Sequence, residues 1–371
     1  MWNDMSEKTM KKLLFISNVT NKVNAFSKAA IFAAQREELY FYSAANWSSA
    51  SPEQIASDQK TYGIKIHNVN ISRSPFSLSN RKAIQQVKEI IRAERIDYIH
   101  CNTPVGGVIG RLLNRDVKKV IYEAHGFHFY KGAPLKNWLI YYPVEKLLAR
   151  RTDAIITINK DDYEFARKHL KSKIYYVPGV GIELDHWSEY KDIREELGLK
   201  LDDFVILVVG RLEKNKNCGT VIEAVRKVLN VKLVFCGDGE DRGKLEEQAK
   251  EIKDRVVFLG NRNDMSDIYH MADCFVLASH REGLSRSIME AMACGLPCIV
   301  TDIRGNRDLI DKEFLFDPYD FSSLAGKIKK VSESQELRSM MTARNLGKIK
   351  EFSFDRAADE LSKIYKEVFL E

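Results

Sequence analysis

Residues 274–301 read CFVLASHREGLSRSIMEAMACGLPCIVT. An apolar strand at 274–277 is followed by a short loop and a helix, and Gly295 and Pro297 end that helix before an apolar strand at 298–301. Strand, loop, helix and strand in this order form one unit of a parallel α/β sheet. The loop lies where the carboxyl end of a strand meets a helix N-terminus, which is the usual place for a phosphate ligand in such sheets.

The same alternation of strands and helices continues along the whole chain. Short apolar runs separated by helical patterns indicate parallel sheets with helices on both faces. In the first half, the expected strands are 13–17, 66–69, 98–101, 120–123, 154–158 and 175–177, with helices such as 81–94 and 161–169. In the second half, the expected strands are 205–209, 233–236, 256–259, 274–277 and 298–301, with helices such as 218–229, 241–252 and 266–271.

The length of 371 residues is too great for one ordinary core and suits two domains. The predicted fold class is therefore α/β, with two doubly wound, Rossmann-like parallel-sheet domains. We expect the first domain at 1–178 and the second at 179–354, followed by an amphipathic helix from 355 onward. Residues 1–9 are expected to be a short leader before the first strand.

Composition limits the classes of function. Apolar residues make up 44% of the chain, but no stretch approaches the roughly 20 consecutive apolar residues of a membrane span. The N-terminus lacks the apolar segment of a signal peptide. The six cysteines have no Cys-x-x-Cys spacing and fall mostly in apolar strands, so we expect buried free thiols of a reducing cytosol rather than disulfides or metal ligands.

Charge is distributed unevenly between the two halves. Residues 1–180 contain 28 Lys and Arg against 16 Asp and Glu, a net +12, whereas residues 181–371 contain 30 against 36, a net −6. The basic first half predicts an anionic partner, such as nucleic acid, an anionic membrane or a phosphorylated acceptor. Zinc-finger spacing and the aromatic signature of RNA-binding sheets are both missing, so nucleic acid is not expected.

Two glutamates, Glu282 and Glu290, mark the loop and the helix of the first segment. With the Gly-Leu after Glu282 and the Ala-Met-Ala-x-Gly-x-Pro after Glu290, the segment resembles the Glu-x7-Glu motif of retaining glycosyltransferases of family 4, which have the GT-B fold. The resemblance covers nearly the whole chain and is densest from 205 to 310. It implies two domains facing a cleft, an acceptor in the first domain, a nucleotide sugar in the second, and a C-terminal helix, 355–371, that packs back on the first domain.

The segment 210–217, which follows the strand at 205–209, contains two cations five residues apart. Arg211 suits a bidentate pair with phosphate and Lys216 supplies a compact charge; a solvated basic loop is the alternative. The family has this Gly-Arg-Leu-x-x-x-Lys element here, which implies that Gly210 lies at the donor and that Arg211 and Lys216 stabilise the leaving nucleoside diphosphate. Two cations and a helix N-terminus need no metal for that role.

Two further loops follow strands of the second half. Gly237, Asp238 and Gly239 resemble the loop that lies beside the donor nucleotide or sugar, and a plain strand-to-helix turn is the alternative. Arg262 and Asn263 follow the next strand and resemble the loop that contacts the nucleobase.

The resemblance also implies roles for the motif itself. Glu290 accepts hydrogen bonds from the ribose hydroxyls, and Glu282 contacts the donor sugar. The N–H groups of Gly283, Leu284 and Ser285 face the pyrophosphate. A surface position is the alternative for Glu290, although its helix is largely apolar and a charge there needs a partner.

In the first half, His125 ends the strand at 120–123, where catalytic groups of parallel sheets collect. The family's histidine at this strand end lies beside the donor sugar, which implies that His125 binds a hydroxyl or helps to stabilise the transition state. An ordinary satisfied polar residue is the alternative, and His128 is a weaker candidate. The expected acceptor contacts are Asn18, Asn21, Phe127 and Lys131, although the loop after the first strand lacks the glycines of many relatives.

The stretch 131–151 contains five cations and one acid, together with Trp138, Tyr141 and Tyr142. This composition is typical of a helix at a membrane interface, and the lipid-linked acceptors common in the family agree with such contact. The alternative is an ordinary helix packed on the sheet with its Leu and Ile residues inward.

The expected function is the retaining transfer of a hexosyl or N-acetylhexosaminyl group from a UDP-linked nucleotide sugar to a polyprenyl-pyrophosphate-linked or oligosaccharide acceptor. The His125 and 305–308 segments resemble bacterial capsular and exopolysaccharide enzymes most. A lipid-linked acceptor at the inner face of the cell membrane fits the basic charge of the first half, so the protein is expected to be cytoplasmic and peripheral on that membrane. No metal or other cofactor is expected, and the nucleotide sugar is a substrate. A nucleotide-sugar epimerase on the same fold and a non-catalytic subunit of a transferase complex remain as alternatives.

Overall fold

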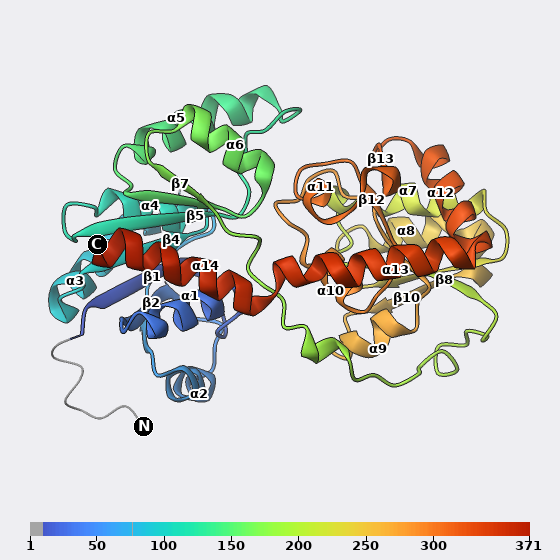
Figure 1. Ribbon diagram of the computed structural model, residues 1–371, viewed down its shortest axis with the longest axis horizontal. Coiled ribbons are helices and arrows are strands. Elements are labelled where there is room, and N and C mark those ends of the chain that lie inside the picture. Colours follow the sequence, from blue (N-terminus) through green and yellow to red (C-terminus); the bar gives the residue numbers. More distant parts are fainter. Residues whose placement is uncertain (1–9, 76) are drawn as a thin grey trace. The chain divides into compact units, whose positions relative to one another are not determined.

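The computed structural model describes residues 10–75 and 77–371 (Figure 1). The leader expected at 1–9 lies outside the described residues. The chain divides into two compact units, the first formed by the residues up to Gly181 with Phe354–Glu371, and the second by Ile182–Ser353. The C-terminal segment therefore belongs to the first unit.

The first unit is built on a seven-stranded parallel sheet in the order β3-β2-β1-β4-β5-β6-β7. Its strands are β1 Lys12–Val19, β2 Tyr40–Asn46, β3 Lys65–Asn68, β4 Tyr98–Asn102, β5 Lys119–Ala124, β6 Ala154–Thr157 and β7 Lys173–Tyr176. Its helices are α1 Ala25–Arg36, α2 Pro52–Tyr62, α3 Ser79–Glu94, α4 Pro104–Leu112, α5 Leu135–Ala149, α6 Lys160–His169 and α14 Phe354–Tyr365. The strand order reverses between β1 and β4, and such sheets bind ligands at the carboxyl ends of strands beside this reversal.

Helix α14 packs against α1 on one face of this sheet (Figure 1). Its buried side chains include Ala357, Leu361, Ile364 and Tyr365, which join residues of the strands in one core cluster. These apolar positions recur at helical spacing while the opposite side of the helix is charged, so one face is buried and the other stays in water.

The second unit contains a six-stranded parallel sheet in the order β10-β9-β8-β11-β12-β13. Its strands are β8 Phe204–Val209, β9 Val231–Cys236, β10 Val256–Gly260, β11 Cys274–Leu277, β12 Cys298–Thr301 and β13 Leu315–Phe316. Its helices are α7 Cys218–Arg226, α8 Arg242–Gln248, α9 Met265–His270, α10 Arg286–Ala293, α11 Asn306–Leu309, α12 Phe321–Glu333 and α13 Gln335–Ile349. The order reverses between β8 and β11, so the loops after these two strands meet at the position where a ligand is expected.

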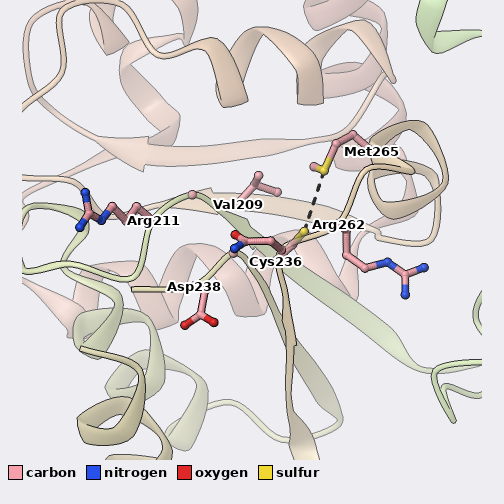
Figure 2. A pocket seen from close by; sticks show the side chains of 9 residues that line it. Val209, Arg211, Cys236, Asp238, Arg262 and Met265 are labelled. Atoms are coloured by element: carbon pink, nitrogen blue, oxygen red, sulfur yellow. Dashed lines mark hydrogen bonds between the residues drawn. The ribbon is translucent and has the colours of Figure 1, made fainter. Parts of the chain in front are cut away.

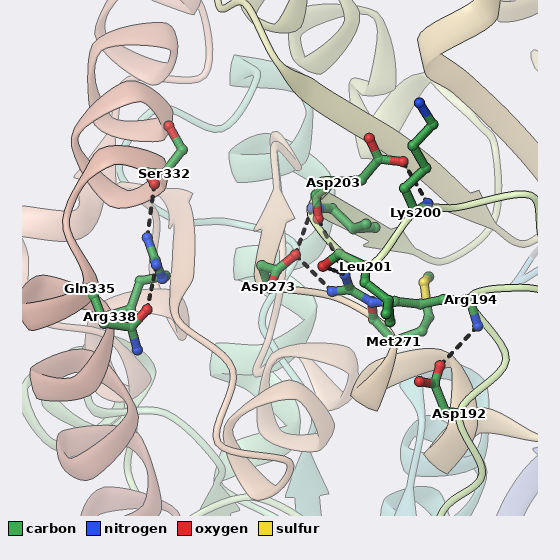
Figure 3. Close-up of polar contacts among 11 residues, drawn as sticks. Asp192, Arg194, Lys200, Leu201, Asp203, Met271, Asp273, Ser332, Gln335 and Arg338 are labelled. Atoms are coloured by element: carbon green, nitrogen blue, oxygen red, sulfur yellow. Dashed lines mark hydrogen bonds and ion pairs between the residues drawn. The ribbon is translucent and has the colours of Figure 1, made fainter.

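The segment that leads into the second sheet is held by Arg194 (Figure 3). Its guanidinium donates to the carbonyl oxygens of Met271 and Asp203, and it pairs with Asp273 Oδ2 at 2.8 Å. The same Asp273 oxygen accepts from the N–H of Val205 at 2.8 Å. One side chain thus ties the incoming segment to the starts of β8 and β11, the two strands that present the candidate site.

Every strand predicted from the sequence is present, and the structure adds β2 and β13. The six cysteines are free, five of them buried and Cys294 half-buried, which confirms the prediction of free thiols. Burial raises the pKa of the Cys218 thiol to about 12, so such thiols stay protonated and act as small apolar side chains.

Candidate active site

The loops after β8 and β11 bring Lys216 and Glu282 together. Lys216 ends a 3-10 turn, Lys214–Lys216, that follows β8, and Glu282 lies between β11 and α10. Lys216 Nζ donates to Glu282 Oε1 over 2.7 Å, and only 18% and 15% of the two side chains are exposed. Salt screens such a shielded pair weakly, so a strong local dipole stands where the sequence predicts the diphosphate and the donor sugar.

Arg211, the other predicted phosphate ligand, lies on the same loop in a different environment. Its side chain is 67% exposed, and its Nε lies 3.6 Å from Glu213 Oε2. The loop backbone is fixed by the N–H of Leu212, which donates to Asp238 O at 3.0 Å. Arg211 therefore presents most of its five N–H donors to a ligand from a well-anchored backbone.

A cavity of about 440 Å³ includes Arg211 in its wall (Figure 2). Figure 2 shows Arg211 and Arg262 at opposite sides of this cavity, with Cys236 and Asp238 between them. Its volume lies in the range of small-molecule pockets, so it suits part of a nucleotide. The lining residues are Val209, Gly210, Arg211, Cys236, Gly237, Asp238, Asn261, Arg262 and Met265.

The glycine loop after β9 packs backbone against backbone. Gly237 has φ +136°, and a Cβ there would lie 2.0 Å from Gly210 O. The Gly237 N–H donates to Gly260 O at 2.8 Å. A side chain at this position would push apart the loops after β8 and β9, so Gly237 has a structural reason to be glycine.

The loop after β10 differs in detail from the sequence prediction. Arg262 lines the cavity, but its Nε already donates to Asp264 Oδ1 at 2.8 Å, and this hydrogen bond lowers the pKa of the Asp264 carboxyl. Asn261 lines the cavity, whereas Asn263 is not among the lining residues. Asn261 and Arg262 are therefore the residues of this loop that line the cavity, and the base contact of Arg262 and Asn263 stays a prediction.

Glu290 projects from α10 with 14% of its side chain exposed. Tyr269 Oη, on α9, donates to Glu290 Oε2 at 2.9 Å, and Arg286 Nε donates to Oε1 at 2.8 Å. A carboxylate accepts about four hydrogen bonds, so Glu290 has capacity for two ribose hydroxyls as well. Tyr269 was not predicted from the sequence, and the one available signal was a tyrosine beside the apolar Ile268 in a short helix, whose hydroxyl needs a partner when buried.

The start of α10 packs tightly on the loop after β12. Gly305 has φ +76°, and a Cβ there would lie 2.1 Å from Gly283 O. Arg304 Nε donates to Glu282 O at 3.3 Å. Ser285, the N-cap residue, makes no side-chain cap hydrogen bond, so the first N–H groups of α10 suit an anion.

In the first unit, His125 follows β5 with 17% of its side chain exposed. Its Nε2 lies 3.6 Å from Glu123 Oε1, and the Phe26 ring packs edge-on against it with centroids 4.7 Å apart. Neither ring nitrogen has a hydrogen-bond partner among residues 10–75 and 77–371. Burial lowers the pKa of the imidazole against the opposing effect of Glu123, so His125 is neutral at pH 7.

The predicted acceptor contacts fall in different environments. Asn18 is half-buried, and its Oδ1 has no partner in the described part of the chain. Asn21 and Lys131 are exposed. Phe127 requires a correction, because its side chain is only 3% exposed and stacks on Phe129 with centroids 4.9 Å apart. Phe127 is a core residue rather than an acceptor contact.

Helix α5 does not present its aromatic side chains outward, as a helix that binds a membrane interface through aromatic residues would. Trp138, Tyr141 and Tyr142 pack against the core of the first unit, so the aromatic rings face inward. The outer face is nevertheless apolar. Its exposed residues are Leu135 at 72%, Leu139 at 68%, Ile140 at 47%, Val144 at 41% and Leu147 at 59%.

Within 10–75 and 77–371, no three or more His, Cys, Asp or Glu side chains gather as a metal ion would require. Over the same residues, none of the helices has both the length and the apolar character needed to cross a bilayer.

Two family models match the chain: "Glycosyl transferases group 1" at residues 189–346 and "Glycosyl transferase 4-like" at 48–159. "Putative glycosyltransferase EpsD" of Bacillus subtilis (strain 168) is 33% identical and covers 96% of this chain and 96% of its own length. The Escherichia coli "UDP-Gal:alpha-D-GlcNAc-diphosphoundecaprenol alpha-1,3-galactosyltransferase" is 29% identical over 80% of this chain and 81% of that protein.

A solved structure gives the same fold. Anabaena HepE in complex with UDP and glucose matches with a TM-score of 0.78 and 18% identity, over 96% of this chain and 100% of that chain. Together with the two doubly wound sheets, this likeness identifies the GT-B fold. The family models and the near-complete match to EpsD show that the chain is a glycosyltransferase of family 4.

Proposed function

We propose that this glycosyltransferase moves a sugar from a UDP-linked donor, with retention of anomeric configuration, to a polyprenyl-diphosphate-linked sugar during synthesis of a bacterial surface polysaccharide. The observation that carries the proposal is the Lys216–Glu282 pair at 2.7 Å. The pair joins the loops at the carboxyl ends of β8 and β11. Lys216 is on the same loop as the exposed Arg211, which lines the cavity.

In this proposal, the donor diphosphate binds to Arg211, Lys216 and the first N–H groups of α10. Negative charge grows on the diphosphate as the glycosidic bond breaks, and the two cations and the helix dipole stabilise it. Lys216 exchanges part of its contact with Glu282 for a phosphate oxygen, and Glu282 then accepts from a sugar hydroxyl. Because these groups supply the positive charge, the proposed transfer needs no divalent metal.

The nucleoside part occupies the cavity beside the diphosphate. Glu290 accepts from the ribose hydroxyls, and the loop of Asn261 and Arg262 lies beside the base. UDP is the proposed nucleotide because the E. coli relative is named for UDP-Gal, and HepE was solved with UDP and glucose.

Retention is proposed to occur by attack on the face that the diphosphate leaves. The acceptor oxygen bonds to the anomeric carbon as the bond to the phosphate oxygen breaks, and that phosphate oxygen takes the acceptor's proton. Glu282 is assigned to a sugar hydroxyl in this proposal and has no covalent role, so the same-face route is proposed rather than a glycosyl-enzyme intermediate.

The acceptor is proposed to bind the basic first unit at the inner face of the cell membrane. The outer face of α5 combines its five exposed apolar residues with the exposed cations Lys136, Lys146 and Arg150. Apolar side chains enter the headgroup region, while neighbouring cations attract anionic lipids. The name of the E. coli relative includes a diphosphoundecaprenol-linked sugar. An acceptor of this kind would lie in that same membrane.

The test is a transfer assay with a panel of UDP-sugars and a short-chain polyprenyl-diphosphate-linked N-acetylglucosamine, with the product linkage read by NMR. An α-linked product from an α-linked donor supports the proposal, and an inverted product contradicts retention. Conversion of the UDP-sugar without acceptor would instead identify an epimerase, and UDP binding without turnover a non-catalytic subunit. The rate should be unchanged by EDTA, whereas its loss and recovery with Mg²⁺ would contradict the metal-free mechanism.

A further inference from the structure

A buried polar network lies next to His125 in the first unit. His100 on β4 and Glu123 on β5 are 0% and 2% exposed. His100 Nε2 lies 3.2 Å from Glu123 Oε2, and the other carboxylate oxygen, Oε1, lies 3.6 Å from His125 Nε2. At the far end, Tyr365 Oη on α14 lies 2.5 Å from His100 Nδ1. Four side chains from three elements and one strand end therefore form a continuous path.

The protons of this network can be assigned from its outer end inward. Burial raises the pKa of the Tyr365 phenol well above its ordinary value, so Tyr365 keeps its proton. Because the carboxylate oxygen Glu123 Oε2 faces His100 Nε2 at 3.2 Å, the Tyr365 hydroxyl is the donor to His100 Nδ1. His100 then has its own proton on Nε2, which faces Glu123 Oε2. Burial acts to raise the pKa of the Glu123 carboxyl, but His125 and His100 outweigh it and the net shift is downward. Glu123 is therefore a carboxylate whose two oxygens each face a histidine ring nitrogen, Oε2 at 3.2 Å from His100 Nε2 and Oε1 at 3.6 Å from His125 Nε2.

The same reasoning determines the tautomer of His125. Its imidazole is neutral and has one N–H, and the carboxylate oxygen Glu123 Oε1 lies 3.6 Å from Nε2. That separation is just beyond hydrogen-bond length, and catalytic hydrogen bonds often shorten when substrate binds. With the proton on Nε2, the other nitrogen, Nδ1, is an acceptor, and it has no partner among the described residues.

We propose that Glu123 is a positioning residue of the transfer reaction, holding His125 with its proton on Nε2 so that Nδ1 accepts a hydrogen bond from a sugar hydroxyl of the substrate. This inference rests on the proposed function, because it requires that His125 contacts the sugar. Tyr365 and His100 orient Glu123 in turn. The C-terminal helix α14 thereby contributes a side chain to the support of the site.

A purely structural network would stabilise the fold without setting the state of His125, and ring nitrogen NMR separates the two cases. In the full-length chain, ¹⁵N shifts of His125 should show a protonated Nε2 and an unprotonated Nδ1. Glu123→Leu removes both acceptor oxygens, so His125 should become a mixture of tautomers. Unchanged His125 shifts in this variant would overturn the inference.

Glu145→Gln is the matched control for that measurement. Glu145 is another buried carboxylate of the first unit, and it pairs with Arg111 Nη1 at 2.6 Å. Its replacement should lower the melting temperature and leave the His125 shifts unchanged. Equal changes at His125 in both variants would mean that general loosening of the unit, rather than Glu123, sets the tautomer, and would overturn the inference.

Kinetics provides the second readout. Glu123→Leu should lower kcat on the order of tenfold or more, with the KM for the UDP-sugar within about twofold of wild type. Glu123→Gln keeps the shape, so it folds if the leucine variant does not; it offers one acceptor oxygen to two N–H donors and should lose part of kcat. If both Glu123 variants are fully active while His125→Ala is inactive, Glu123 does not position His125 and the inference is overturned. A fully active His125→Ala variant overturns that role too, but loss of transfer in Lys216→Ala would still support the proposed function.

Discussion

Lys216 Nζ lies 2.7 Å from Glu282 Oε1, so the residue assigned to the diphosphate and the residue assigned to the sugar satisfy each other within the chain. Each side chain is less than one-fifth exposed, and a partly buried charge needs a partner. The pair therefore holds both groups in place before either contacts a ligand, which is the kind of preorganisation that electrostatic catalysis requires.

Lys216→Ala should lower the free energy of unfolding by about 1–3 kcal/mol, because it leaves the Glu282 carboxylate partly buried and unpaired. It should also abolish transfer. The double variant Lys216→Ala/Glu282→Ala removes the stranded charge and should regain stability without regaining activity. Urea unfolding and transfer rates measure both effects. Lys214→Ala, at an exposed neighbouring lysine, is the control, and equal stability of the single and double variants would contradict the pairing.

Arg211→Ala should separate ligand binding from stability. Because 67% of the Arg211 side chain is exposed, the substitution should leave the free energy of unfolding within about 0.5 kcal/mol of wild type. UDP is expected to raise the melting temperature of the wild type, and this rise should disappear in the variant because the diphosphate loses a bidentate cation. A thermal shift with UDP as large as that of wild type would remove Arg211 from the donor site.

The strands that the sequence reveals are those with uninterrupted apolar runs. β2 reads YFYSAAN, in which serine and alanine dilute the signal although the strand is almost wholly buried. β13 has two residues, and it exists because Val300 and Thr301 of β12 offer a free edge to pair with. Neither pairing has a local sequence pattern, so both strands had to be found in the structure.

The residues of the candidate site likewise fall into those that the sequence predicted and those that only the structure revealed. Lys216 and Glu282 were found through motifs, because each follows a strand with a recognisable loop. Tyr269 and Glu123 were not, since their roles arise only when elements distant in sequence pack together, as with the 265 positions between His100 and Tyr365. Such contacts leave no local spacing to read.

Glu290 should discriminate between ribose and deoxyribose. Wild-type protein should bind UDP more tightly than 2′-deoxy-UDP, by roughly 1.5–3 kcal/mol for one hydrogen bond to a charged group, as measured by calorimetry. Glu290→Ala should remove most of this difference while weakening UDP itself. Tyr269→Phe, which removes only the hydroxyl that donates to Glu290, should retain the preference, because the carboxylate remains. Equal affinities of the wild type for both nucleotides would contradict the assignment.

Leu139→Glu/Leu147→Glu should abolish sedimentation with phosphatidylglycerol vesicles and leave folding intact. Both leucines are more than half exposed on α5, so their change removes no core packing. Each leucine that enters the membrane contributes about 1.5–3 kcal/mol to binding by leaving water. Wild-type binding should also weaken as salt rises, since the flanking cations are screened. Leu229→Glu, at a leucine of the second unit that is 79% exposed, is the control. Unchanged sedimentation of the double variant would exclude α5 as the membrane contact.

The pH dependence of transfer should follow His125. If its neutral imidazole accepts a hydroxyl hydrogen bond, protonation removes the acceptor and kcat/KM falls on the acid side. Burial lowers the pKa of His125, Glu123 opposes this and His100 adds to it, so the acid limb should lie below the ordinary histidine value of about 6.5.

The free energy of unfolding should also fall as the pH is lowered, as kcat/KM does, because the unfolded chain takes up the His125 proton at a higher pH than the folded chain does. The contribution of the neutral imidazole is therefore complete above the unfolded pKa and is lost as the pH falls through and below it. Glu123→Gln removes the one nearby group that raises the pKa of His125, and its acid limb should move to still lower pH. Tyr365 on α14 is uncharged across this range and Phe26 on α1 does not titrate, so neither should create a limb of its own. Profiles of kcat/KM from about pH 5 to about pH 8 decide the matter: an acid limb above the ordinary value, or a shift to higher pH in Glu123→Gln, would show that another group controls the reaction.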